Sequence, residues 1–70
     1  MYVILTLQLE QEEDGRWIAE VVDLPGTLVY GGSPEEATAR VKALALRVLA
    51  DRIEHDEAQA DFGDIAFVAA

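Results

Sequence analysis

The residues in this sequence that could do chemistry are mainly carboxylates in one short stretch, Glu10, Glu12, Glu13 and Asp14. Such a cluster could hold a divalent cation or contact basic side chains. It also suits a solvated hairpin tip, where charge discourages aggregation through exposed strand edges. We interpret it as a hairpin tip, and we expect Glu12, Glu13 and Asp14 to form part of a surface that meets a partner protein.

Metal-dependent cleavage of a phosphodiester requires several carboxylates that converge on metal ions. The interior-facing strand positions carry Val, Leu, Ala and Trp instead, and Asp23 is the only carboxylate that closes a strand beside a turn. We interpret Asp23 as a turn residue that caps backbone amides around Pro25. The sequence therefore predicts a non-enzymatic protein without a catalytic residue, a metal site or a cofactor.

The other reactive residue types have structural explanations. His55 is the only histidine and the chain has no cysteine, so His55 alone makes a poor metal ligand or base. Ser33 precedes a helix start and can cap it, and Trp17 shares the apolar face of its strand. Gly31 and Gly32 lack the following lysine and the spacing of a phosphate-binding loop.

The composition indicates a small domain that associates with other proteins. The chain has 70 residues, a size at which one hydrophobic core is barely sufficient, and we treat residues 1–70 as a single domain. Yet 51% of the residues are hydrophobic, and no cysteine is present to form a stabilising disulfide. We therefore expect another copy, in a dimer or tetramer, or another protein to cover part of the apolar surface.

The charge of the chain narrows the choice of partner. Fourteen acidic and five basic residues give a formal net charge of −9. A field of this sign repels nucleic acid backbones and favours basic partners, so we expect no direct nucleic acid binding. The apolar start of the chain has no basic region and is interrupted at Glu10, which predicts neither a signal peptide nor a membrane span. We expect a cytoplasmic protein.

Alternating apolar residues predict two strands at the start of the chain, over residues 2–12 and 16–23. A two-residue turn between them would set the apolar Leu9 opposite an acidic residue, whereas a three-residue loop sets it opposite Ala19. A slip of one residue exchanges the two faces of a strand, so burial favours the three-residue loop. Gly15 would then take the left-handed conformation that this loop requires.

The next stretch contains a tight turn and a helix start. Pro25 and Gly26 fit the central positions of a type II turn, which reverses the chain into a third strand over residues 27–30. Ser33 can cap the helix that follows, and Glu36 can complete a capping box.

The predicted helix runs from Pro34 to about His55 and carries two apolar stripes. The first stripe, which we expect to pack on the sheet, consists of Ala37, Val41, Leu44 and Val48. The second consists of Leu46, Leu49 and Ile53 with Ala39, Ala43 and Ala50. Because a surface helix normally has one apolar face, the second stripe predicts an interface between subunits, with Leu46, Leu49 and Ile53 at its centre.

After a polar connection, an apolar strand is predicted over residues 65–69. Its nearly unbroken apolarity is typical of a strand covered on both faces or paired inside a larger sheet. The crossover through the helix makes this strand parallel to the first. We predict an α+β fold of the type β-β-β-α-β, with a four-stranded mixed sheet in the order 3-2-1-4 and the helix across one face.

The face of the first hairpin that points away from the helix is half apolar. It carries Tyr2, Ile4, Ile18 and Val22 beside polar residues. Such a face is typical of a contact surface. We expect these four side chains, together with the acidic tip, to form the surface that meets a partner.

The stretch "EEDGRWIAEVVDLPGTLVYGGSPEEA" resembles the HicB-like antitoxin domain. The pattern comprises an acidic-glycine hairpin followed by an aromatic residue, the turn Asp23-Leu24-Pro25-Gly26, and a helix opening at Ser33-Pro34-Glu35-Glu36-Ala37. The resemblance covers residues 3 to about 53. This sequence differs in having Thr27 where a cysteine often follows the turn. We also expect it to lack the DNA-binding segment that many members carry after the last strand.

This resemblance implies a truncated ribonuclease-H-like fold without nuclease activity. Proteins of this family are antitoxins of type II toxin–antitoxin systems; they oligomerise and mask a small basic HicA toxin, which cleaves RNA. The resemblance therefore implies an antitoxin that binds such a toxin, although we expect no autorepression by this chain alone. The alternative is an orphan domain that self-associates in a structural or regulatory role and has no toxin partner.

Overall fold

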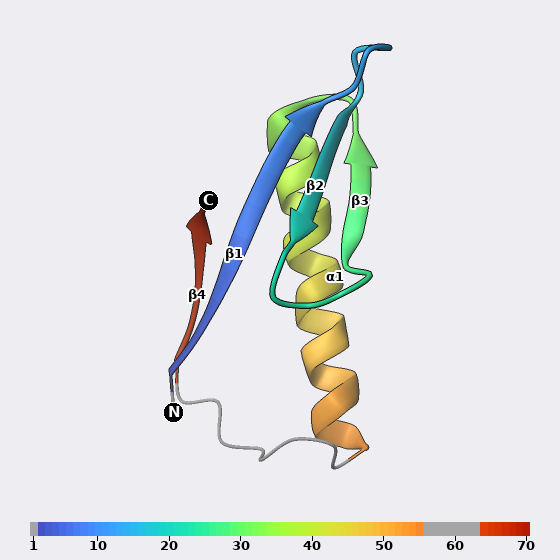
Figure 1. Cartoon of the computed structure of the whole chain (residues 1–70). Helices are drawn as coiled ribbons and strands as arrows, with labels where there is room; N and C mark the ends of the chain where they lie inside the picture. The colour runs from blue at the N-terminus through green and yellow to red at the C-terminus, as the bar shows by residue number, and fades with distance from the viewer. Residues whose placement is uncertain (1, 56–63) are drawn as a thin grey trace.

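The chain forms a three-stranded meander, one helix and a final strand. The computed structural model describes residues 2–55 and 64–70. The strands are β1 (Tyr2–Gln11), β2 (Trp17–Val21), β3 (Leu28–Gly31) and β4 (Asp64–Ala69), and helix α1 (Pro34–Glu54) follows β3 (Figure 1). The polar connection predicted between the helix and the last strand falls almost entirely outside the described residues.

The four strands form one mixed sheet in the order β3-β2-β1-β4. β2 is antiparallel to both β1 and β3, and β4 runs parallel to β1. Helix α1 lies on one face of the sheet, mainly against β2 and β3 (Figure 1). The predicted α+β fold with strand order 3-2-1-4 is therefore confirmed.

Strand β4 lies at the edge of this sheet and is less covered than its apolar sequence predicts. Its neighbour on one side is β1. Ile65 and Val68 are 39% and 41% exposed, on opposite faces of the strand. The expectation of a strand covered on both faces or paired inside a larger sheet is therefore wrong for the single chain. The reason is that α1 packs mainly over β2 and β3, whereas β4 lies at the opposite edge of the sheet.

The hairpin between β1 and β2 has the predicted register. Leu9 pairs with Ala19, and Leu7 pairs with Val21. Gly15 has a φ of 92°, the left-handed conformation expected in the three-residue loop. This register directs Ala19 and Val21 to the inner face of the sheet, where both are buried.

The turn after β2 is also of the predicted type. Gly26 has a φ of 85°, and the N–H of Thr27 donates to the carbonyl of Leu24 over 3.0 Å. This hydrogen bond and the positive φ define a type II turn with Pro25 at its first central position.

Asp23 has a different partner from the predicted one. Its carboxylate accepts a hydrogen bond from the backbone N–H of Thr6 in β1. β2 ends at Val21, and the N–H of Val22 donates to the carbonyl of Thr6 over 3.0 Å. The Asp23 carboxylate therefore supplies an acceptor for the Thr6 N–H at the point where β2 ends. The interpretation of Asp23 as a cap for the amides around Pro25 is wrong.

Helix α1 begins as the sequence predicts, with one difference. Ser33 is the N-cap, and its hydroxyl accepts from the N–H of Glu36 over 3.1 Å. The Glu36 carboxylate accepts from the N–H of Gly32 over 2.8 Å, one residue before the donor of an ordinary capping box. Both side chains therefore satisfy backbone donors at the helix start.

The hydrophobic core lies between α1 and the inner face of the sheet. Its buried apolar residues are Leu5, Ala19, Val21, Leu24, Ala37, Val41, Ala45 and Leu49. Trp17 and Phe67 pack against this core and are partly buried. The prediction that Trp17 is a packing residue is therefore confirmed.

Helix α1 buries a row of every fourth residue, from Ala37 to Leu49. In the predicted core stripe, Leu44 and Val48 are only partly buried. A row with a spacing of four is inclined to the helix axis, so it can follow a twisted sheet along its length. Leu49, which was expected at a subunit interface, is only 5% exposed and belongs to the core of the single chain.

Gly31 ends β3 where the backbone of α1 passes close by. A Cβ atom at Gly31 would lie 2.6 Å from the backbone nitrogen of Ala37 and 2.9 Å from its Cα. The first turn of α1 therefore rests directly on the end of the sheet, and only glycine permits this approach.

Replacing Leu49 by alanine should lower the free energy of unfolding by about 2–4 kcal/mol, because the substitution leaves a cavity beneath α1. Leu46→Ala is the matched control. Leu46 is 47% exposed, so its replacement should change the free energy by about 0.5 kcal/mol or less. Urea titration followed by circular dichroism measures both, and equal losses would contradict the core position of Leu49.

Gly31→Ala should destabilise the chain by about 1–3 kcal/mol, because the new methyl group meets backbone atoms of Ala37 that cannot move aside. Gly32→Ala is the control, since a Cβ there would lie 3.7 Å from the Glu36 carboxylate, an ordinary contact. Thermal unfolding compares the two variants. A Tm for Gly31→Ala equal to that of Gly32→Ala would show that α1 does not need this close approach.

Candidate interaction surface

The outer face of the sheet, opposite α1, is open within the part of the chain that the structure describes (Figure 1). Strand alternation places Ile4, Ile18 and Val68 on this outer face. Ile4 is 52% exposed, and Val22, which follows β2, is 47% exposed. The outer face therefore offers apolar area to a partner.

Three exposed apolar side chains gather around Thr6 on the outer face. Thr6 pairs with Val68 in the register of β1 and β4, and its carbonyl accepts the N–H of Val22. Ile4 lies two residues before Thr6 on β1 and points to the same face. We name Ile4, Val22 and Val68 the distal patch, because they lie near the first half of β1, away from the hairpin tip that follows Gln11.

A second apolar pair lies nearer the hairpin tip. Ile18 pairs with Tyr30 across β2 and β3, and with Glu10 across β1 and β2. The guanidinium carbon of Arg16 lies 4.4 Å from the centre of the Tyr30 ring, a cation–π contact. Gln8 and Glu20, which pair with each other, separate Ile18 from the distal patch.

Sequence reasoning missed three apolar residues of the outer face, Leu28, Tyr30 and Val68. Leu28 and Tyr30 are each 40% exposed. They lie two residues apart on β3, and the pairing of β3 with β2 could have assigned them to this face. Val68 carried no such signal, because β4 is apolar on both faces and its sequence does not alternate.

The acidic hairpin tip is held in shape by Asp14. Its carboxylate accepts from the backbone N–H of Arg16 over 3.0 Å and from the Arg16 side chain over 2.7 Å. Both hydrogen bonds stabilise the charged carboxylate and so hold the pKa of Asp14 below its usual value. The bond from the backbone N–H has the larger effect. Asp14 is therefore a turn residue of the tip, and the exposed Glu13 remains for contact with a partner.

The structure divides the predicted partner surface. Ile4 and Val22 come together in the distal patch, Ile18 lies with Tyr30, and Glu12, Glu13 and Asp14 project from the end of the sheet (Figure 1). The backbone of Tyr2 pairs with Asp64. The Tyr2 side chain lies outside the described part of the structure, so its place in the surface stays a prediction.

Helix α1 carries a second apolar surface on the side away from the sheet. Leu46 and Ile53 are 47% and 38% exposed. The exposed alanines at positions 39, 43 and 50 continue the row with alternating spacings of four and three residues, as in a coiled-coil seam. We name residues 39, 43, 46, 50 and 53 the helix stripe. It includes Leu46 and Ile53 of the three predicted interface residues, whereas Leu49 lies in the core.

Within residues 2–55 and 64–70, no group of three or more His, Cys, Asp and Glu side chains gathers to hold a metal ion. The Nδ1 atom of His55 lies 2.8 Å from the carbonyl oxygen of Asp51 and 3.2 Å from its carboxylate, at the end of α1. α1, the helix of the described residues, is not apolar enough over a sufficient length to cross a membrane.

Comparison with known proteins leaves the family of this chain open. No protein-family model, no curated protein and no solved structure matches it. The HicB-like resemblance therefore stays an expectation from the sequence, and the surfaces described above are the structural basis for a functional proposal.

Proposed function

We propose that this chain is a non-enzymatic interaction module, an antitoxin of a type II toxin–antitoxin system that binds and masks a small, basic, RNA-cleaving toxin. The observation that carries the proposal is the open outer face of the sheet, where the exposed distal patch belongs to a chain of net charge −9. The HicB-like resemblance supplies the class of partner. The complex would form in the cytoplasm, without a cofactor.

Charge and apolar area have different parts in this proposal. Glu10 and Glu20 lie on the outer face, and Glu13 is exposed at the hairpin tip. Their long-range attraction speeds the encounter with a basic protein, whereas water excluded around Ile4 and Val22 slows dissociation. Masking is steric, because the bound chain occupies the basic groove that the toxin needs for RNA.

The purified chain should abolish RNA cleavage by a cognate HicA-like toxin at saturating concentration. The double variant Ile4→Thr, Val22→Thr should weaken inhibition by about tenfold or more, because it removes apolar contacts and keeps residues suited to strands. The readout is the inhibition constant from a fluorogenic RNA substrate.

Leu46→Gln serves as the matched control in this assay, because it removes an exposed leucine from the opposite side of the molecule. Its inhibition constant should equal that of the unmutated chain. Cleavage that continues undiminished at saturating protein would refute the antitoxin assignment.

The helix stripe favours a second candidate function, self-association of an orphan domain without a toxin. Its alanines allow a second helix to approach closely, and Leu46 and Ile53 provide the larger contacts. Within the part of the chain that the structure describes, α1 packs on β2, β3 and β1, and no other element lies over the helix stripe.

Light scattering at micromolar concentration should give the mass of a dimer or tetramer if this second candidate is correct. Leu46→Glu should then reduce the mass to that of a monomer, because the interface would bury unpaired carboxylates. Arg47→Glu, at an exposed position beside the stripe, should retain the larger mass. A monomeric mass for the unmutated chain would exclude the helix stripe as a subunit interface.

A further inference from the structure

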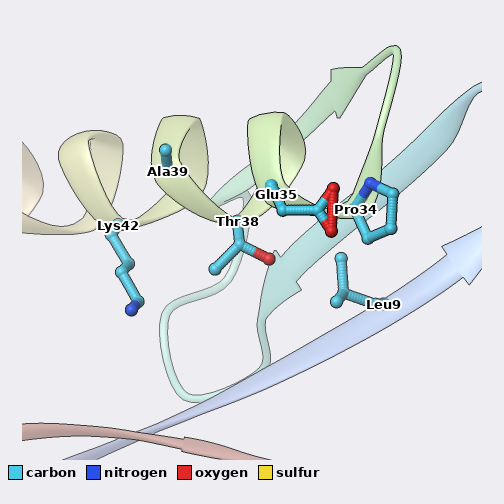
Figure 2. Close-up of a pocket in the computed structure, with 6 residues that line it drawn as sticks. All are labelled: Leu9, Pro34, Glu35, Thr38, Ala39 and Lys42. Carbon is cyan, nitrogen blue, oxygen red and sulfur yellow. The ribbon is translucent and has the colours of Figure 1, made fainter.

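The helix stripe is bounded on both sides by basic side chains that contact the sheet. Arg40 donates a hydrogen bond to the Tyr30 carbonyl in β3 over 3.1 Å. On the other side, the Nζ atom of Lys42 lies 5.6 Å from the centre of the Phe67 ring in β4. Figure 2 shows Lys42 pointing from α1 toward β1, whereas Ala39, the first residue of the stripe, points away from β1. The stripe is therefore a distinct apolar face of α1 between two basic borders.

Charge distinguishes α1 from the rest of the chain. The helix contains four basic and four acidic residues, whereas the remainder of the chain contains one basic and ten acidic residues. Helix α1 is therefore the electrically neutral element of a chain with net charge −9, and two copies repel each other least when they meet through it. A basic protein is attracted to the acidic remainder instead. The charge distribution thus favours a second copy as the partner of the helix stripe.

The sizes of the side chains in the stripe indicate how two copies would pair. Leu46 and Ile53 are exposed, and the stripe positions 39, 43 and 50 are exposed alanines. In a parallel pair of helices, equal positions face each other, so leucine meets leucine and alanine meets alanine, which leaves gaps between the alanines. In an antiparallel pair, Leu46 can face Ala50 of the second copy while Ile53 faces Ala43. Each layer then contains one large and one small side chain, which keeps the distance between the helices even.

The charged residues beside the stripe suit the same antiparallel arrangement. Arg40, Arg47 and Glu54 are exposed and recur every seven residues, so they follow one flank of the stripe. When a two-fold axis relates two antiparallel helices, this flank of one helix meets the same flank of the other. In the register described above, Arg40 of each copy lies beside Glu54 of the other. These two ion pairs outnumber the one contact between like charges, that of the two Arg47 side chains near the axis.

We propose that two copies of this chain pair through the helix stripe with their α1 helices antiparallel, so that Leu46 of each copy packs against Ala50 of the other and Arg40 pairs with Glu54. The inference rests on the self-association named above as the second candidate function, and it supplies the direction and register of the contact. Because α1 and the outer face lie on opposite sides of the sheet (Figure 1), the pairing leaves the distal patch of each copy uncovered.

Spin labels on single introduced cysteines test the direction, since the chain has no cysteine of its own. Glu35→Cys and Arg47→Cys place labels at exposed positions near the start and the middle of α1. In the antiparallel pair, the two labels at position 47 lie within about 20 Å of each other, because the axis passes close to them. The two labels at position 35 lie about 40 Å apart, since about 13 residues separate each from the axis. A parallel pair would bring both sets of labels within about 20 Å, and pulsed EPR measures these distances.

Charge reversal tests the register. Glu54→Arg should weaken dimer formation by about tenfold, because it replaces each ion pair with Arg40 by a contact between two arginines. Asp51→Arg is the matched control, since it changes the net charge by the same amount at an exposed position away from the stripe. It should leave the dimer at least as strong as before, because the two copies then repel each other less. Sedimentation equilibrium at a series of concentrations measures the dissociation constants.

Short distances at both labelled positions would overturn the antiparallel direction and leave self-association in place. Equal effects of Glu54→Arg and Asp51→Arg would overturn the contact between Arg40 and Glu54. A monomeric mass of the unmutated chain at the concentration of the EPR measurement would overturn this inference together with the second candidate function. The antitoxin assignment is tested separately by RNA cleavage, so undiminished cleavage beside the expected label distances would refute only that assignment.

Discussion

One helix can bury only one face of a sheet, and this limit governs the whole molecule. The row from Ala37 to Leu49 packs on the inner face, mainly over β2 and β3. Its small residues, with Gly31 beneath the first helical turn, allow the helix to lie close to the sheet. A chain of 70 residues has no second helix among its described elements to cover the outer face. Apolar side chains on that face therefore remain in contact with water unless a partner covers them.

Two exposed apolar surfaces remain, and they differ in what they can bind. The distal patch offers apolar side chains on a sheet face, whereas the helix stripe offers a seam of small and large residues. Glu10 and Glu20 lie on the same sheet face as the distal patch, which is why we propose a basic partner for it. The helix stripe is the surface best suited to a second copy, since its alanines favour close helix packing.

Part of the candidate surface could be predicted from the sequence. Ile4, Ile18 and Val22 could be assigned to the outer face because strands alternate with a period of two residues, and the β1–β2 register follows from burial. Val68 could not, since its place depends on which part of β1 pairs with β4. The pairing of two strands far apart in sequence is set by the crossover through α1, and nothing in either strand alone specifies its register.

Residue types and spacing were enough to predict the positive φ angles of Gly15 and Gly26, the cap at Ser33 and the strand order. Those features depend on residues within a few positions of one another, or on connection rules that allow few topologies. The burial of Leu49 in the core and the hydrogen bond from the Thr6 N–H to Asp23 follow only from the folded arrangement. Each of these depends on the angle at which the helix crosses a twisted sheet and on distances between remote segments, which residue types and spacing do not specify.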